Sequence, residues 1–463
     1  MTQVSSVTHA ISINPATGEQ IGHYPFQSAS DLDAALARAA AGFSVWRRTP
    51  VEQRAQALVV LARTLRDNAA TMANMISVEM GKPVTQARGE IEKCAQLCEW
   101  YAEHGPAMLT AEPTLVEGGK ARIEYRPLGP ILAVMPWNFP IWQVLRGAVP
   151  ALIAGNTYVL KHAPNVMGSA YLLRDALQRA NFPEGVFEVI NVTPDGVSTA
   201  IADPRIAAVT LTGSVRAGMA IGAQAGAAMK KCVLELGGSD PFIVLNDADL
   251  DEAVKAAVIG RYQNTGQVCA AAKRLIVEQG IVEEFTRKFV EATRQLVVGD
   301  PLAADTYIGP MARFDLRDEL DQQVRDTLEE GATLLLGGKK AEGPGNYYEP
   351  TVFADVTDQM TSFKQELFGP VASIITARDA AHALALANDS DFGLASTIYT
   401  RNVELAQQMA GELETGGVFI NGYCASDPRV TFGGVKKSGF GRELSHFGVR
   451  EFCNAQTVWL DRR

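Results

Sequence analysis

The chain has 463 residues, of which 47% are apolar and 20% are charged, a composition typical of a globular protein with ample core material and two or three domains. Its 42 basic and 52 acidic residues give a net charge of −10, which argues against nucleic acid or an anionic membrane as a partner. Six cysteines without a C-x-x-C pair, and only six histidines, argue against a metal site. Sparse cysteine and the absence of a secretory or membrane-spanning pattern predict a cytoplasmic protein.

The first hundred residues have the spacing of helices. Residues 49–52 (TPVE) predict a capping box with proline at the first helical position, and the pattern stops at Gly81. A second helix should end at 105–106 (GP). Cys94 and Cys98 are four positions apart, which suits a metal pair or a core face. The core interpretation is favoured because free cysteine is commonly buried.

A β-hairpin is predicted next. Residues 114–117 and 120–125 flank a two-glycine turn, 118–119. An isolated hairpin is not stable alone. It should therefore pack on the body of the protein or on another subunit.

Residues 130–245 alternate between short β-rich runs and helical segments such as 168–180 and 215–228. The predicted strands are 131–135, 158–161, 187–192, 207–212, 231–236 and 242–245. This alternation predicts an α/β fold, a parallel sheet with helices on both faces. Such sheets bind ligands at the carboxyl ends of their strands. The candidate loops follow Met135, Lys161, Thr212 and Leu236.

The rest of the chain repeats this style and predicts a second α/β domain. Its predicted strands are 273–278, 373–376, 397–400, 417–421 and, in the tail, 457–460. Its predicted helices are 249–264, 281–296, 314–330, 380–388 and 402–413. A glycine-rich loop, 432–443, lies late in the chain.

Three segments carry the residues of acyl-thioester chemistry. Cys269 lies in a turn of small residues, 263–272 (QNTGQVCAAA), and Glu235 ends an apolar run before two glycines. A thiol is a nucleophile and a half-buried carboxylate is a base. Asn138, between aromatic residues in 136–140 (PWNFP), suits an oxyanion donor, or the segment is a structural turn.

No Walker motif and no G-x-G-x-x-G sequence is present. Gly213 and Ser214 begin a helix after a strand, where backbone N–H groups bind phosphate or the serine simply caps the helix. Lys161 is either a ribose or phosphate ligand or a sheet-edge lysine. Glu366 is either a ribose ligand or an ordinary charge at a helix end.

Together and in this order, the motifs resemble the aldehyde dehydrogenase superfamily over residues 14–451. Segments 261–273 and 421–447 are similar to those of the short bacterial succinate-semialdehyde dehydrogenases. The resemblance implies that Cys269 attacks the aldehyde, that Asn138 and the Cys269 N–H hold the oxyanion, and that Glu235 activates the hydrolytic water.

The resemblance also implies a nicotinamide cofactor. The residues implied at its ribose, pyrophosphate and nicotinamide parts are Lys161, Trp137, Gly213, Ser214, Glu366 and Phe368. One position departs from the family pattern, because Pro164 replaces the glutamate with which NAD-specific members bind the adenosine ribose. We therefore expect use of NAD with some tolerance for NADP.

For the substrate, Arg146 matches a carboxylate-binding arginine of succinate-semialdehyde dehydrogenases, and its fork suits a carboxylate. The alternative is a salt bridge on a helix surface. Gln263 replaces a second arginine of some relatives, and Ser426 could add a polar contact. The predicted reaction is oxidation of succinate semialdehyde to succinate. The rivals are a broad aliphatic or aromatic aldehyde dehydrogenase, a cofactor-independent cysteine esterase, and a silent binding protein.

Three parts are implied by the same resemblance. Residues 1–107 and 127–236 would form a cofactor-binding domain, and 237–445 a catalytic domain. Residues 108–126 and 446–463 would form a small β oligomerisation element. A homodimer or homotetramer is expected.

Overall fold

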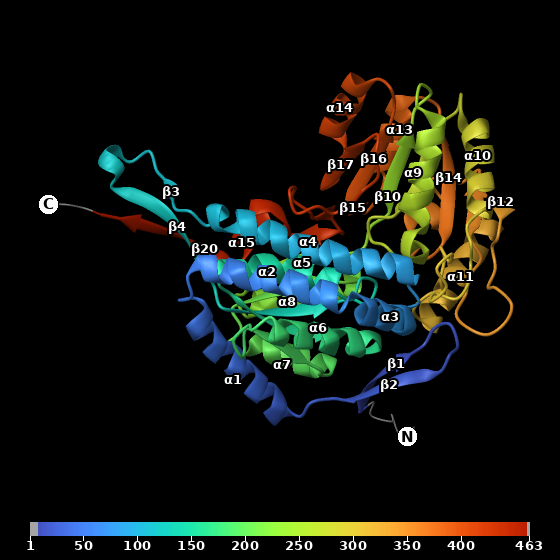
Figure 1. Cartoon of the computed structure of the whole chain (residues 1–463). Helices are drawn as coiled ribbons and strands as arrows, with labels where there is room; N and C mark the ends of the chain where they lie inside the picture. Colours follow the sequence, from blue (N-terminus) through green and yellow to red (C-terminus); the bar gives the residue numbers. More distant parts are fainter. Residues whose placement is uncertain (1–7, 461–463) are drawn as a thin grey trace.

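The computed structural model describes residues 8–460 and confirms the α/β fold (Figure 1), whose two largest sheets have six and seven strands. The first sheet has the order β19-β9-β8-β5-β6-β7. Its strands are β5 (Pro130–Met135), β6 (Thr157–His162), β7 (Phe187–Ile190), β8 (Ala208–Thr212), β9 (Lys231–Glu235) and β19 (Gly439–Phe440). Strands β5 to β9 are parallel, and β19 runs antiparallel to β9. The strands predicted over 131–212 and 231–236 are therefore confirmed to within about two residues.

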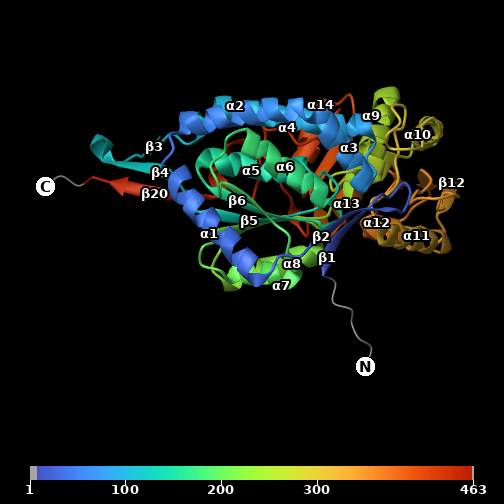
Figure 2. The ribbon, with the colours of Figure 1, turned by 60° about the horizontal axis from the view of Figure 1, so that its bottom comes forward.

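Helices cover both faces of this sheet. They are α1 (Ala29–Trp46), α2 (Val51–Asp67), α3 (Ala69–Met80), α4 (Val84–Met108), α5 (Trp142–Ala154), α6 (Met167–Arg179), α7 (Pro194–Ala202) and α8 (Val215–Ala227). Side chains of α2 to α6 form the core on one face, and those of α1, α7 and α8 form the core on the other (Figure 2). Cys94 and Cys98 are fully buried in the first core, which confirms the apolar interpretation of that pair.

Several details of the first hundred residues differ from the prediction. An antiparallel pair, β1 (His9–Ile13) and β2 (Gln20–Pro25), precedes α1 and was not predicted, because its strands are short and largely exposed. The capping box is wrong. Pro50 is the N-cap of α2, no side chain caps the helix, and the Thr49 hydroxyl donates to the Val45 carbonyl at 3.2 Å.

The predicted helix ends are also displaced. Asn68, with φ −104°, separates α2 from α3, so the single predicted helix is two. Helix α4 continues through Pro106 to Met108.

The second sheet has the order β12-β13-β14-β11-β10-β16-β17, parallel except for β12. Its strands are β10 (Asp240–Val244), β11 (Ala272–Glu278), β12 (Thr333–Leu336), β13 (Thr351–Ala354), β14 (Val371–Ala377), β16 (Ala395–Tyr399) and β17 (Gly417–Ile420). Its helices are α9 (Leu250–Tyr262), α10 (Val282–Arg294), α11 (Phe314–Glu329), α12 (Thr361–Lys364), α13 (Ala380–Asn388) and α14 (Val403–Glu412). Strand β10, predicted at the end of the first alternation, lies inside this second sheet, and β12 and β13 were not predicted.

A three-stranded arm projects from the body in both views (Figures 1 and 2). Its order is β20-β4-β3, with β3 (Glu112–Pro113), β4 (Ala121–Pro127) and β20 (Cys453–Trp459). The predicted strand at 114–117 is wrong, since β3 lies just before it and a short 3-10 turn, Glu117–Gly119, leads into β4. Helix α15 (Ser445–Glu451) comes before β20. Within residues 8–460, no helix is both long and apolar enough to cross a bilayer.

Candidate active site

A cavity of about 640 Å³ opens at the carboxyl ends of β5, β8 and β9, and its other side is lined by Cys269, residues of α11 and the segment with Glu366 and Phe368. Seven of the residues singled out in the sequence line it: Trp137, Asn138, Gly213, Ser214, Cys269, Glu366 and Phe368. The cavity therefore lies at the strand ends where parallel sheets commonly bind ligands. Glu235, Lys161, Arg146, Gln263 and Ser426 do not line this cavity.

The cysteine turn is a short 3-10 segment, Gln263–Gly266, between α9 and β11. Asn264 and Thr265 have left-handed backbone angles, φ +54° and +57°, and Gly266 has φ +71°. A Cβ on Gly266 would lie 2.2 Å from the carbonyl oxygen of Gly369. Only glycine therefore allows this close approach, which sets the path of the chain into Cys269.

The Asn138 loop is tied to the cysteine turn. The Asn138 Nδ2 donates to the Gln267 carbonyl at 3.0 Å, and the Asn264 Nδ2 donates to the Asn138 carbonyl at 2.8 Å. An amide nitrogen carries two hydrogens, so one remains for a ligand in the cavity. The side chain of Asn138 is thereby held against the turn that leads into Cys269.

Glu90 and Lys82 fix the helix that follows Asn138. Glu90 Oε1 accepts from the backbone N–H groups of Ile141 and Trp142, both at 2.9 Å, at the start of α5. Its other oxygen forms a buried ion pair with Lys82, whose ammonium lies 3.7 Å from the centroid of the Phe139 ring. A carboxylate at a helix N-terminus satisfies otherwise unpaired N–H groups. This arrangement anchors the loop that carries Asn138.

Glu235 ends strand β9 and is 2% exposed. A Cβ on Gly433 would lie 2.8 Å from its Oε1, so the carboxyl group faces the glycine-rich loop. Among residues 8–460, that oxygen has no hydrogen-bond partner. Burial raises the pKa of Glu235 to about 8, and the charge of Arg146 opposes that rise. A carboxyl group with such a pKa can accept a proton near neutral pH.

Burial raises the pKa of the Cys269 thiol to about 11, and the charges of Arg146 and Lys273 act against that rise. The carboxylates of Glu235 and Asp240 raise it further. The thiol is therefore mainly protonated at neutral pH, and the two cations are the groups that favour its thiolate.

Lys273 is a site residue that the sequence did not reveal. It is 2% exposed at the start of β11, and its ammonium donates to the carbonyl oxygens of Val268 at 2.8 Å and Cys269 at 2.6 Å. It also pairs with Glu366 Oε1 at 3.2 Å, an oxygen that accepts from the Gly238 N–H at 3.1 Å. One lysine thus holds both the nucleophile loop and the carboxylate of Glu366. The only sequence signal was a charged residue at the start of an apolar strand.

The residues predicted for the rest of the cofactor have simple surroundings. Ser214 is the N-cap of α8, and its hydroxyl accepts from the Ala217 N–H. The Gly213 N–H donates to the Glu235 carbonyl at 3.0 Å, and this bond joins the end of β8 to the end of β9. Phe368 meets Trp137 edge to face, with centroids 5.7 Å apart. Lys161 lies at the end of β6, where burial lowers the pKa of its ammonium.

The three predicted substrate residues lie in different surroundings. Arg146, on α5, is 2% exposed, forms an ion pair with Glu443 and lies 4.6 Å from the centroid of the Phe432 ring. The salt bridge considered as the alternative therefore exists, but inside the protein. Ser426 accepts a hydrogen bond from Lys93. Gln263 is exposed at the C-terminal end of α9.

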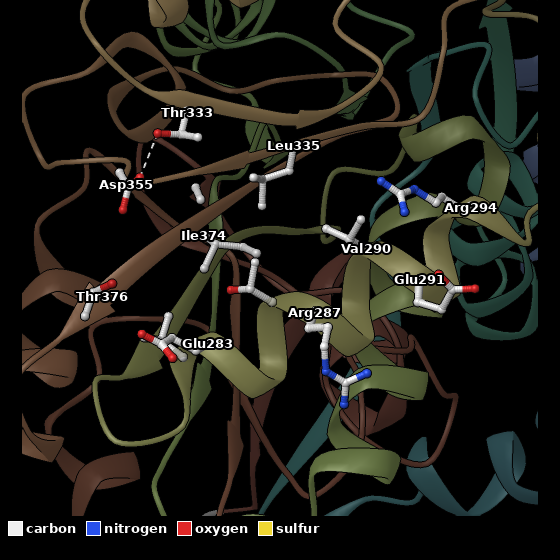
Figure 3. A pocket seen from close by; sticks show the side chains of 13 residues that line it. Glu283, Arg287, Val290, Glu291, Arg294, Thr333, Leu335, Asp355, Ile374 and Thr376 are labelled. Carbon is white, nitrogen blue, oxygen red and sulfur yellow. Dashed lines mark hydrogen bonds between the residues drawn. The ribbon is translucent and has the colours of Figure 1, made fainter.

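A second hollow, of about 770 Å³, lies far from these groups, between α10 and strands β12 to β14 (Figure 3). It is lined by charged side chains such as Glu283, Arg287 and Asp355, and the Thr333 hydroxyl donates to Asp355 at 2.7 Å. It contains no cysteine and no histidine. The cavity with Cys269 is therefore the candidate active site.

The fold and this site define the class of protein. The chain matches the aldehyde dehydrogenase family over residues 2–458, and it belongs to that family. It is 66% identical to the NAD(P)+ succinate semialdehyde dehydrogenase Sad of Escherichia coli (strain K12), over 99% of each chain. It is 48% identical to the NADP+ succinate-semialdehyde dehydrogenase of Mycobacterium avium (strain 104), over 97% of this chain and 96% of that one.

A solved structure of a related enzyme has the same fold. The succinic semialdehyde dehydrogenase from Streptococcus pyogenes, in complex with NADP+, superposes with a TM-score of 0.95 at 35% identity. The match covers 98% of this chain and 100% of that chain.

Proposed function

We propose that this protein is an NAD(P)-dependent dehydrogenase that oxidises succinate semialdehyde to succinate. The observation that carries the proposal is the grouping of Cys269 and Asn138 in one cavity, with the buried base Glu235 behind it. Support for the substrate comes from the relatives at 66% and 48% identity, whose names state this aldehyde.

In the proposed reaction, the Cys269 thiolate adds to the aldehyde carbon. The oxyanion that forms accepts hydrogen bonds from the Asn138 Nδ2 and the Cys269 backbone N–H, which are preorganised donors. The carbon then loses its hydrogen as hydride and becomes a thioester carbonyl. Glu235 takes a proton from water, the water oxygen attacks the thioester, and the cysteine thiolate leaves as the acid forms.

The cavity suits a dinucleotide cofactor. It runs from the N-terminus of α8, a 13-residue helix whose first N–H groups favour phosphate, to Cys269. We propose that Trp137, Gly213 and Ser214 hold the pyrophosphate end. Glu366 and Phe368 would hold the nicotinamide end, and Lys161 the adenosine ribose. When bound, NAD(P) supplies the hydride acceptor.

Pro164 carries the proposed cofactor preference. A glutamate at this position would favour the ribose diol and repel a 2′-phosphate, and proline does neither. We propose use of NAD with tolerance for NADP. A ratio of catalytic efficiencies beyond about 10³ in either direction, roughly 4 kcal/mol, would contradict it.

Arg146 remains the proposed source of positive charge for the substrate carboxylate, with Ser426 as a polar contact and Gln263 at the outer end. Its Nη2 has no hydrogen-bond partner among residues 8–460, which leaves a donor for a ligand. Replacing Arg146 by Ala should raise KM for succinate semialdehyde far more than for an uncharged aldehyde. Equal increases for both would leave a broad aldehyde dehydrogenase in which Arg146 only packs.

We also propose the three-part organisation, with residues 1–107 and 127–236 for the cofactor, 237–445 for catalysis, and 108–126 and 446–463 for assembly of a homodimer or homotetramer. A cytoplasmic location fits the sparse cysteine content. The test of the function is formation of reduced nicotinamide from succinate semialdehyde, which should vanish in Cys269→Ala. Ester cleavage without any dependence on cofactor, and without aldehyde oxidation, would favour the esterase instead.

A further inference from the structure

Lys93, which the proposed reaction does not use, is a partly buried cation without a counter-ion. It lies on α4, and its ammonium lies 4.0 Å from the centroid of the Trp142 ring and donates to the Ser426 hydroxyl at 3.0 Å. Within residues 8–460, no carboxylate lies within ion-pairing distance of it. Taking an ammonium out of water is costly unless an anion compensates it.

The neighbouring cation, Arg146, has a counter-ion. Arg146 already faces the Glu443 carboxylate inside the protein, so its charge is matched. The positive charge of Arg146 and that of Lys93 act on each other, and the Arg146 charge disfavours the protonated form of Lys93. Of these two cations, Lys93 is the one whose charge still lacks a fixed partner.

The groups around Lys93 lie close to the segment that carries Cys269. Trp142, beneath the ammonium, begins α5, and the next residue, Gln143, lines the cavity with Cys269. Cys424 lies two residues before Ser426. Burial chiefly raises the pKa of the Cys424 thiol, and this thiol is close enough to both groups that Cys269 raises its pKa further while Lys93 lowers it. Cys424 and Ala270, the residue after Cys269, line one small hollow, so the segment that carries Ser426 passes beside the cysteine turn, next to the cavity and outside its lining.

We propose that the Lys93 ammonium, together with the Ser426 hydroxyl, binds the terminal carboxylate of the substrate and so selects aldehydes that carry a negative charge a few bonds from the carbonyl. This inference rests on the proposed function and adds to Arg146 a second cation, on α4, for the substrate's charged end. In that role the ammonium supplies the positive charge, and the hydroxyl, which keeps its own hydrogen while it accepts from Lys93, supplies a second donor.

Burial lowers the pKa of Lys93 to about 8. The charged and titratable groups that face it are Glu90 and Cys94 on α4, Arg146 on α5 and Asp427 beside Ser426. The ammonium is thus mainly charged at neutral pH and loses its charge as pH rises through about 8. Preference for a carboxylate-bearing aldehyde should fall over the same range.

The test compares kcat/KM for succinate semialdehyde and for butanal, an uncharged aldehyde of the same chain length, in the full-length enzyme. Lys93→Met should lower the value for succinate semialdehyde about 10- to 100-fold, the loss of one charge-assisted hydrogen bond, and change that for butanal by less than about threefold. Lys93→Arg should restore much of the preference. Lys255→Met, which removes an exposed lysine on α9, should change neither.

If the methionine variant fails to fold, the same comparison is made with Lys93→Gln, which keeps a donor for Ser426 but carries no charge. A selective loss with succinate semialdehyde in Lys93→Gln supports the proposal. Equal losses with both aldehydes, or none, overturn it while leaving the proposed function intact. A wild-type enzyme that oxidises butanal as well as succinate semialdehyde overturns the proposed substrate, and the role of Lys93 with it.

Discussion

Glu235 is buried and Cys269 is partly buried, and both have a raised pKa, to about 8 and about 11. Each is therefore mainly protonated at neutral pH before the substrate binds. In the proposed reaction, the charges of Arg146 and Lys273 favour the Cys269 thiolate, whereas Glu235 becomes able to accept a proton as pH rises. The two effects can be measured separately, because the thiolate acts in the first step of the proposed reaction and Glu235 acts in the hydrolysis of the thioester.

For the base, we predict that Glu235→Gln lowers the steady-state rate about 10²- to 10⁴-fold, the usual contribution of a general base, while the first turnover stays fast. Rapid mixing should show a burst of reduced nicotinamide close to one equivalent per site, followed by slow turnover. In the wild type, thioester hydrolysis should accelerate as pH rises through about 8, because only the deprotonated carboxyl group accepts a proton. A variant without a burst would place Glu235 in an earlier step.

Lys273 gives a second prediction at the scale of the residue. Its charge favours the Cys269 thiolate, and its ammonium holds the carbonyls of the nucleophile loop. Lys273→Met should raise the pKa of Cys269 and so reduce the thiolate fraction, and alkylation by iodoacetamide at neutral pH should slow about 10-fold. Lys273→Arg should recover part of the rate, and the exposed-site control Lys255→Met should match the wild type. An unchanged pH profile of alkylation would contradict an electrostatic role.

At the scale of the element, the turn before Cys269 depends on one glycine. A side chain on Gly266 would press on the carbonyl of Gly369, three residues beyond Glu366. We predict that Gly266→Ala lowers both the thermal midpoint and the rate of alkylation of Cys269, because the backbone strain alone costs about 1–3 kcal/mol. The measurements are thermal unfolding and iodoacetamide kinetics.

Gly226→Ala is the matched control, since it lies inside α8 and no atom lies within 4 Å of its added Cβ. Alanine there should stabilise the protein by about 0.4–1 kcal/mol and leave Cys269 unaffected. A Gly266→Ala protein as stable and as reactive as this control would show that the turn relaxes around the new methyl group.

The buried parallel strands could be predicted from the sequence because their apolar runs alternate with helical segments between glycines and prolines. Strands β1 and β2 are largely exposed and therefore lack that pattern. The capping box failed because a proline took the N-cap position.

The residues of the candidate site also separate into those that could be predicted from the sequence and those that could not. Cys269, Asn138 and Gly213 lie in recognisable turns, so their motifs were visible. Lys93 and Lys273 belong to no recognisable motif, and their contacts with Ser426 and Glu366 join residues that are distant in the sequence. Lys93 and Ser426 are 333 positions apart.

At the scale of the whole molecule, the arm of β3, β4 and β20 buries little of its own surface. The edge of β20 away from β4 is free within the described chain, and the exposed side chains near its end include Trp459, 58% exposed, and Leu460, 55% exposed. Exposed strand edges with apolar side chains favour pairing with another chain. The arm is therefore the part of the molecule most suited to assembly.

We predict that the protein sediments as a dimer or tetramer and that Trp459→Asp shifts it toward smaller species while circular dichroism stays unchanged. The physical reason is the cost of burying an unpaired carboxylate in an interface. Met229→Asp, at a position 93% exposed on the body, should leave the sedimentation unchanged. Identical sedimentation of the wild type and Trp459→Asp would show that assembly does not use the end of β20.

The most direct measurement of the central claim is steady-state formation of reduced nicotinamide from succinate semialdehyde, with NAD and NADP assayed side by side and Cys269→Ala as the control. We predict turnover with both cofactors, a preference between them smaller than about 10³-fold, and none in the control. Turnover that persists in Cys269→Ala would contradict the thioester route. Turnover with a neutral aldehyde but none with succinate semialdehyde would keep that route and contradict the proposed substrate.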